Sequence, residues 1–167
     1  MPESKAAFLV NADTDPVQLV VNGRACFQNA PPIKDFFDSM IRQGKRNFVV
    51  DLGACEGMDS TFLGILASAG IELSGFKDKG ELTLIHLDEK NLDSVQSLGL
   101  DHLVNVDLNG ETELEPCKYE MLGGETKTES VHAKIALDAH QSLIRVNKAN
   151  SAKFEDVIKY IEERMDG

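Results

Sequence analysis

The sequence is poor in several residue types, and each shortage argues against a class of protein. Its 167 residues contain no tryptophan, two tyrosines and only three cysteines. Cys26, Cys55 and Cys117 form no C-x-x-C pair, so we expect neither a zinc site nor a disulfide framework, and a reducing compartment fits. Basic residues number 17 against 28 acidic ones, giving a net charge of −11. Nucleic-acid binding usually requires a basic patch, so we expect no nucleic-acid partner.

Long apolar runs and the common catalytic motifs are also missing. The longest weakly polar run, residues 62–71, is about half of what a membrane span needs, and residues 1–10 lack a secretory pattern. No phosphate-binding glycine motif occurs, and Met58 and Phe62 replace the glycines of a nucleophile elbow around Ser60. The four histidines lack the spacing of a helical metal pair, so we expect them to be solvated or to cap helices. We therefore predict a cytoplasmic, non-enzymatic protein with no metal, no cofactor and no membrane insertion.

Strands alternating with amphipathic helices are predicted for residues 1–109, which indicates one α/β domain. The predicted strands cover residues 8–10, 17–21, 47–52, 81–88 and, at an edge, 102–108. Helices are predicted over residues 33–43, 61–74 and 91–99. The first helix has one apolar stripe, formed by Ile33, Phe36, Phe37, Met40 and Ile41. The near-continuous apolar run of residues 47–52 is typical of an inner strand covered on both faces.

The composition changes after residue 109. Residues 110–128 are polar and rich in glycine, which predicts a linker. Residues 129–167 contain two amphipathic stretches separated by the short break NKANS, which predicts an antiparallel helical hairpin. Three roles remain open for this C-terminal extension: completion of the core, pairing in a homodimer, or an additional docking surface for a partner.

The junction between the strand at residues 47–52 and the next helix carries an unusual run of polar residues. Asp59, Ser60 and Thr61 are followed directly by an apolar helix. Aspartate and serine are favoured N-caps, and a single cap contributes about 1 kcal/mol of helix stability. Three successive residues of capping type exceed what a cap requires, so capping alone leaves part of this pattern unexplained.

The stretch VVDLGACEGMDSTFLGIL resembles the signature of STAS domains, the family typified by bacterial anti-sigma factor antagonists. Asp51-Leu52, Asp59-Ser60-Thr61 and Leu63-Gly64 match the family pattern in order and spacing. The segment VQLVVNGRACF resembles the second strand of the family and the turn at Gly23 that follows it. The resemblance implies a STAS-like mixed β-sheet layered with α-helices. Two positions depart from the pattern, since Phe62 stands where the family has glycine and no aspartate follows Gly23.

The resemblance also implies a function and a site. Ser60 corresponds to the residue that a partner serine kinase, itself the anti-sigma factor, phosphorylates, and Thr61 is the second candidate. The unphosphorylated domain would bind this kinase, the phosphorylated domain would release it, and a PP2C-type phosphatase would reset the switch. The implied partner-binding residues are Gly23, Asp59, Thr61, Phe62 and Leu63.

Two alternative functions remain open within the same family. The domain could be a constitutive accessory subunit of a lipid or anion transporter, which the missing aspartate after Gly23 favours. It could also be a sensor that holds a small ligand in a cavity. Neither alternative uses the Ser60 hydroxyl as a phosphate acceptor.

Overall fold

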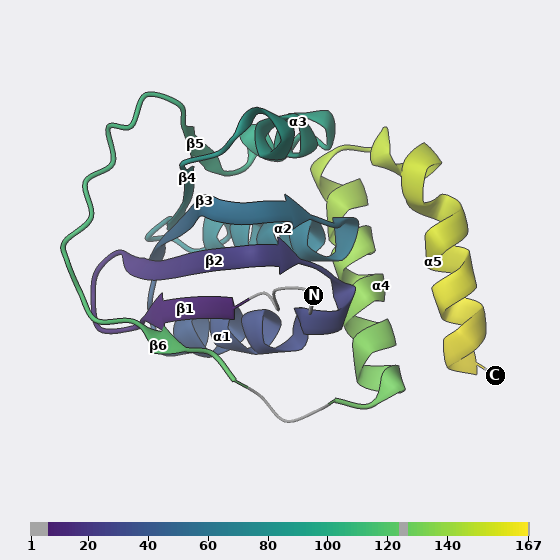
Figure 1. The fold of residues 1–167 in the computed structure, drawn as a ribbon. Coiled ribbons are helices and arrows are strands. Elements are labelled where there is room, and N and C mark those ends of the chain that lie inside the picture. Colours follow the sequence, from purple (N-terminus) through teal and green to yellow (C-terminus); the bar gives the residue numbers. More distant parts are fainter. Residues whose placement is uncertain (1–6, 124–126, 167) are drawn as a thin grey trace, which may run out of the picture.

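A six-stranded mixed β-sheet is the centre of the computed structural model, which describes residues 7–123 and 127–166. The strand order is β5-β4-β3-β2-β1-β6 (Figure 1). Strands β2 to β5 pair in parallel, whereas β1 pairs antiparallel with both β2 and β6. The strands are β1 (Ala7–Asn11), β2 (Val17–Ala25), β3 (Asn47–Met58), β4 (Glu81–Ile85), β5 (Asn105–Asp107) and β6 (Glu120–Met121). The predicted mixed α/β sheet is confirmed.

Helices surround this sheet on one face and at one end. In Figure 1, α1 and α2 lie behind the sheet, α4 crosses the end at which the arrows of β2 and β3 point, and α5 is outermost. The helices are α1 (Pro31–Arg42), α2 (Ser60–Ser74), α3 (Glu89–Ser97), α4 (Glu129–Val146) and α5 (Asn150–Asp166), with short 3-10 turns at Phe27–Asn29 and Leu100–His102. An ion pair of 2.7 Å between Arg164 and Glu129 joins the far ends of α4 and α5. The predicted antiparallel hairpin is therefore confirmed.

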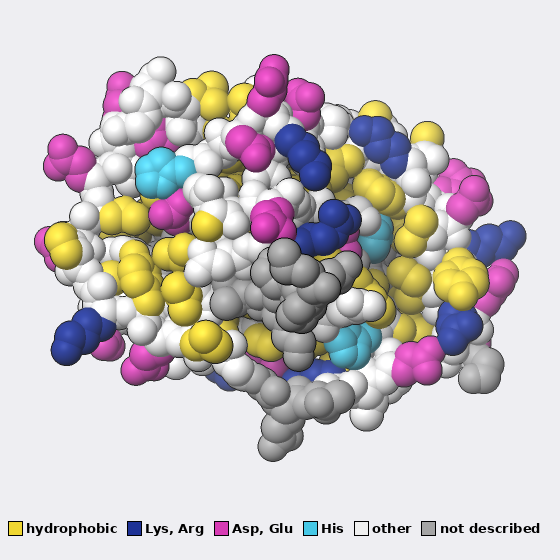
Figure 2. All heavy atoms as spheres, viewed as in Figure 1, with side chains coloured by type: hydrophobic (Ala, Val, Ile, Leu, Met, Phe, Trp, Pro, Cys, Tyr) yellow, Lys and Arg dark blue, Asp and Glu magenta, His cyan; other side chains and the backbone are white. Residues whose placement is uncertain are grey.

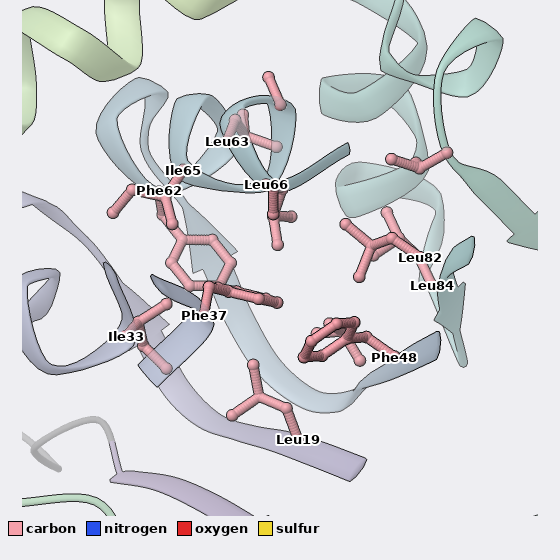
Figure 3. Packing of buried hydrophobic residues seen from close by; sticks show 14 of the residues in the cluster. Leu19, Ile33, Phe37, Phe48, Phe62, Leu63, Ile65, Leu66, Leu82 and Leu84 are labelled. Carbon is pink, nitrogen blue, oxygen red and sulfur yellow. The ribbon is translucent and has the colours of Figure 1, made fainter. Parts of the chain in front are cut away.

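The core lies between the sheet and the pair α1 and α2. The ring of Phe62 points from α2 toward α1 and the sheet, close to Phe37 and Ile33 (Figure 3). Phe62 stacks on Phe8 with ring centroids 6.1 Å apart, and Phe37 lies 5.5 Å from Phe48. All five residues of the apolar stripe predicted for α1 are buried. The packing of Phe62 in this core holds the first turn of α2 against the sheet.

Strand β3 is longer than its sequence predicts. Residues 53–58 follow the strand predicted to end at Leu52, and their polar, glycine-containing sequence predicts a loop. They instead continue as a strand to Met58, paired with β2 through Arg24 opposite Gly57 and Ala25 opposite Met58. Two register shifts interrupt this pairing, and such bulges let a polar, glycine-containing segment remain in a sheet without an alternating pattern. The prediction that this segment is a loop was wrong because backbone pairing leaves no periodic signal in the side chains. The extension carries the chain directly to Asp59.

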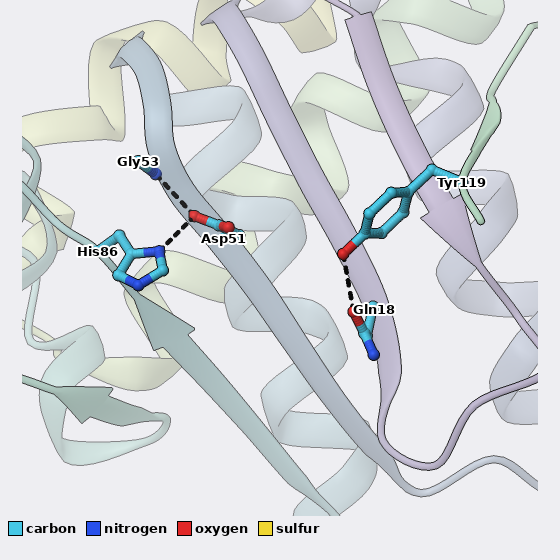
Figure 4. A network of polar contacts seen from close by, with 5 residues as sticks. All are labelled: Gln18, Asp51, Gly53, His86 and Tyr119. Carbon is cyan, nitrogen blue, oxygen red and sulfur yellow. Dashed lines mark hydrogen bonds and ion pairs between the residues drawn. The ribbon is translucent and has the colours of Figure 1, made fainter. Parts of the chain in front are cut away.

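The segment predicted as a linker contacts the sheet at Gln18 and at the edge of β1. The Gln18 side chain is buried there, donating from Nε2 to the Glu115 carbonyl oxygen at 3.2 Å. Tyr119 donates its hydroxyl to Gln18 Oε1 at 2.8 Å, and beside it Asp51 Oδ1 accepts the Gly53 N–H and contacts His86 Nδ1 (Figure 4). Strand β6 then adds to the edge of β1. Residues 115–121 are therefore attached to the sheet, and the division into domain, linker and extension stays a prediction.

The drawn surface is mixed in charge, and the described helices are short or polar. Acidic and basic side chains are interspersed with hydrophobic ones across the face drawn in Figure 2. In the ranges 7–123 and 127–166, no helix combines the length and apolarity that a bilayer crossing requires.

Candidate functional site

Asp59 is the N-cap of α2 and fixes the start of that helix. Its Oδ1 accepts the backbone N–H of Phe62 at 3.0 Å, and its Oδ2 accepts the N–H of Phe27 at 2.7 Å. The N–H of Asp59 donates to the Ala25 carbonyl oxygen at the end of β2. One carboxylate thus satisfies the cap and joins α2 to the neighbouring strand and turn. The hydroxyl of Ser60, the first residue of the helix, is not needed for capping.

The Ser60 hydroxyl instead contacts a histidine from the C-terminal hairpin. Ser60 Oγ lies 2.8 Å from His140 Nε2, and His140 Nδ1 lies 2.6 Å from the carbonyl oxygen of Ala136. Because a carbonyl oxygen only accepts, Nδ1 carries a proton and donates it; in the neutral ring Nε2 is then an acceptor. With the ring neutral, the Ser60 hydroxyl therefore donates a hydrogen bond to His140 Nε2. The imidazole is 3% exposed and packs edge-on against Phe154 of α5, with centroids 5.1 Å apart.

Small residues on α2 allow α4 to pack closely against it. Ser60, Gly64 and Ser68 are four residues apart and so share one face of α2. A β-carbon at Gly64 would collide with the backbone carbonyl of Ala139. Further along the same face, Ser68 Oγ and Ser142 Oγ are 2.6 Å apart. Two hydroxyl-centred hydrogen bonds therefore flank a backbone contact that only glycine permits.

The predicted partner-binding residues are not gathered on an exposed rim in this structure. Ser60 and Asp59 are half-buried, whereas Thr61, Phe62 and Leu63 are buried. Gly23, with a φ of +87°, lies in β2 opposite Cys55 of β3. The expectation that Phe62 lies beside the hydroxyl at the surface does not hold here, because its ring fills the space between α2 and the sheet. Partner binding through these residues stays a prediction.

Sequence reasoning missed His140. The expectation that the histidines are solvated or cap helices is wrong for this residue, which is buried in the contact between α4 and α2. A signal was available in the sequence, since His140 directly follows Ala139 and precedes Leu143 by three positions on the apolar side of its helix. Its hydroxyl partner lies 80 residues away, and no local pattern connects the two positions.

Two further features near the junction bear on its chemistry: the Cys55 thiol and the arrangement of metal-ligating side chains. The Cys55 thiol is buried and donates to the Gly57 carbonyl oxygen at 3.4 Å, and burial raises its pKa. A raised thiol pKa reduces the thiolate fraction, and the thiolate is the reactive form. Among the residues that the structure describes, no group of three or more histidine, cysteine or acidic side chains is arranged to hold a metal ion.

The layered sheet, the polar start of α2 and the chain order together define a STAS-type α/β domain. The family described as "Mlab, STAS domain" matches residues 8–107, more than half of the chain. The chain belongs to this STAS family. Its C-terminal hairpin lies outside the matched residues.

A solved structure has the same fold. The crystal structure of an anti-sigma factor antagonist from Mycobacterium paratuberculosis matches with a TM-score of 0.54 and 22% sequence identity. The match covers 64% of this chain and 89% of the other, and at this identity it shows a shared fold. A comparison with curated proteins gave no match.

Proposed function

We propose that this protein is a protein-interaction module of the anti-sigma factor antagonist type, controlled by phosphorylation of Ser60. The observation that carries the proposal is that Asp59 alone caps α2, so the helix does not need the half-buried hydroxyl beside it. The buried position of Thr61 favours Ser60 as the acceptor. The partner is a serine kinase that is also the anti-sigma factor, and a PP2C-type phosphatase reverses the modification.

The electrostatics of the helix start suit such a switch. A helix N-terminus carries partial positive charge, so a phosphate at Ser60 does not by itself unfold α2. Phosphorylation adds about −1.5 to −2 charges beside the carboxylate of Asp59. A partner surface that fits a neutral hydroxyl must then desolvate a dianion next to a second negative charge. A hundredfold loss of affinity corresponds to only about 2.7 kcal/mol, which is within that desolvation cost.

Intact-mass analysis tests the proposal. The full chain is incubated with ATP and candidate serine kinases of the histidine-kinase-like ATPase class. We expect a gain of about 80 Da for one phosphate, absent in Ser60→Ala and retained in the matched control Thr61→Val. A phosphate retained in Ser60→Ala, or no phosphate with any kinase that binds the chain, would contradict the proposal.

A second candidate function is a constitutive subunit of a membrane transporter. Two observations favour it: Gly23 is followed by Arg24, Ala25 and Cys26 with no aspartate in the turn, and the Ser60 hydroxyl is already paired within the chain. This candidate predicts stoichiometric co-purification with a transporter, with Ser60 unmodified in cells and with assembly unchanged in Ser60→Ala.

A further inference from the structure

The C-terminal hairpin, defined as α4 and α5, covers the hydroxyl to which the proposed function assigns the switch. Ser60 Oγ is within hydrogen-bond distance of His140, a side chain of α4 that is almost fully buried and packs against Phe154 of α5. The close contact of Gly64 with Ala139 one turn further on leaves α4 no room to move closer to α2. A kinase that transfers phosphate to Ser60 must place ATP in line with Oγ, and α4 lies against this atom.

The contact of α4 with the rest of the fold is close and partly polar. The buried residues of α4 are Ala136, Ala139, His140, Ser142 and Leu143. Among the described residues of α5, only Asn150 is buried, and its Nδ2 donates to the carbonyl oxygens of Leu98 and Leu143. Ala139 and Leu143 belong to the hydrophobic core, and packed against it are Ile135, Val146 and Phe154. The contact therefore combines apolar burial with individual hydrogen bonds. Opening of the hairpin as a unit, with the sheet still folded, is the motion that access to Ser60 requires.

We propose that the C-terminal hairpin is an intramolecular cover that controls access to Ser60, and that phosphorylation of Ser60 holds it open. The proposal rests on the proposed function, because it assigns a regulation to the same site. In the transfer, a bond forms between Ser60 Oγ and the γ-phosphorus of ATP, the bond to ADP breaks, and the hydroxyl proton leaves to the kinase or to solvent.

The geometry of the closed form excludes the product of that transfer. A distance of 2.8 Å between Ser60 Oγ and His140 Nε2 leaves no space for a phosphorus atom and three oxygens. The donor that satisfied the imidazole is also lost, since an esterified oxygen has no proton to give. The added charge would be half-buried beside Asp59, where water is partly excluded. We therefore expect a phosphate on Ser60 to displace the His140 ring and, with it, α4.

Coupling of this kind has a kinetic consequence. When only the open form is competent, the rate of phosphorylation is reduced by the fraction of molecules that are open. Substitutions that loosen the hairpin raise that rate, and a covalent link across the contact of α2 with α4 lowers it.

Hydrogen-exchange mass spectrometry on the full chain tests the cover without a kinase. The samples are the unmodified chain, the chain with phosphoserine incorporated at position 60, and Ser60→Asp, with Ser74→Asp as the matched control at the exposed far end of α2. We expect exchange in α4 to rise by about tenfold or more in the two charged forms, with β2, β3 and β4 unchanged and the control within about twofold of wild type. Unchanged or slower exchange of α4 in the phosphoserine form would overturn the proposal.

A second pair of variants keeps the test decisive if a charge at position 60 disturbs the whole fold. His140→Ala removes the buried acceptor and leaves Ser60 intact, so it must raise exchange in α4 by a similar factor, and His140→Gln, which retains an acceptor, must restore part of the protection. If His140→Ala leaves the exchange of α4 unchanged, the proposal fails.

A reversible crosslink separates this proposal from the proposed function. The hydroxyl oxygens of Ser68 and Ser142 are 2.6 Å apart, so cysteines at both positions are placed for a disulfide, in a background with Cys26→Ser and Cys117→Ser. With a kinase that modifies Ser60, oxidation must lower the rate by about tenfold or more and reduction must restore it. Equal rates in both redox states would refute the cover and leave the acceptor role intact. If Ser60→Asp releases α4 in the exchange experiment but no kinase that binds the wild-type chain transfers phosphate to Ser60, the acceptor role alone is refuted.

Discussion

The STAS layer, residues 7–107, and the C-terminal hairpin, residues 129–166, are built from different buried side chains. Phenylalanine, leucine and isoleucine dominate the fully buried large residues of the layer. Phe62 is one of them and packs between α2 and the sheet. In the hairpin the buried residues are mainly alanine, serine, histidine and asparagine. Burial of apolar area is the main source of stability. We infer that large apolar side chains set the stability of the layer, whereas the hairpin combines Leu143 and small buried residues with individual hydrogen bonds.

The largest expected effect comes from the core of the layer. Phe62→Ala removes a buried ring that stacks on Phe8, and a cavity of this kind costs about 3–5 kcal/mol in the free energy of unfolding. Phe154→Ala is the matched change in the hairpin, where the ring is only half-buried against His140. We expect its global effect to be below about 1.5 kcal/mol. Urea unfolding followed by circular dichroism measures both, and equal losses would contradict the comparison.

Gly64→Ala tests the close contact between the two regions. Alanine favours a helix by about 1 kcal/mol over glycine, so α2 itself gains, but the new methyl collides with the Ala139 carbonyl. We expect a net loss of about 1–3 kcal/mol that is confined to the hairpin and appears as faster amide exchange in α4. Gly70→Ala on the same helix is the control, because its methyl meets the ends of the Leu103 and Val104 side chains, which can move. Unchanged exchange in α4 would show that the close contact of Gly64 with Ala139 does not determine how firmly α4 packs on α2.

Asn150→Ala removes the side chain that joins the start of α5 to both regions. Its amide donates to Leu98 at 2.9 Å and to Leu143 at 2.7 Å, and leaving a buried carbonyl without its donor costs about 1–3 kcal/mol. We expect the loss to appear as faster amide exchange in α5. Asn147→Ala, exposed in the same connection, should change exchange by less than about twofold. Similar effects of the two variants would mean that Asn150 does not hold the hairpin.

The smallest expected effect lies at the turn where the layer ends. The Thr112 hydroxyl and the backbone N–H groups of Asn109, Glu111 and Thr112 hold the pKa of the Asp107 carboxyl well below its usual range. A lowered pKa in the folded state contributes stability above the unfolded pKa of about 4, and this is lost as the pH falls toward the folded pKa. Asp107→Asn should therefore loosen residues 109–112 at pH 7 and differ less from wild type in acid. Exchange rates of these amides, with Asp93→Asn as control, measure the effect, and a pH-independent difference would contradict it.

Much of the layer could be predicted from local patterns, and parts of the site could not. The stripe of α1, the inner position of β3 and the helix after Asp59 follow from side-chain period and capping chemistry. The extension of β3 to Met58 could not be predicted in this way, because it depends on pairing with β2 through register shifts. The burial of Phe62 was also missed, since a resemblance at the helix start does not reveal which face of α2 points inward.

The amino-acid sequence by itself determined the alternation of strands and helices, the polar start of α2 and the presence of two amphipathic helices at the C-terminus. These features depend on spacings of a few residues, and backbone geometry converts such spacings directly into faces and caps. Only the tertiary structure decided that the Ser60 hydroxyl and the His140 imidazole form a hydrogen bond. That contact joins two helices distant in the chain, and it exists because the small residues of α2 let α4 approach to hydrogen-bonding distance.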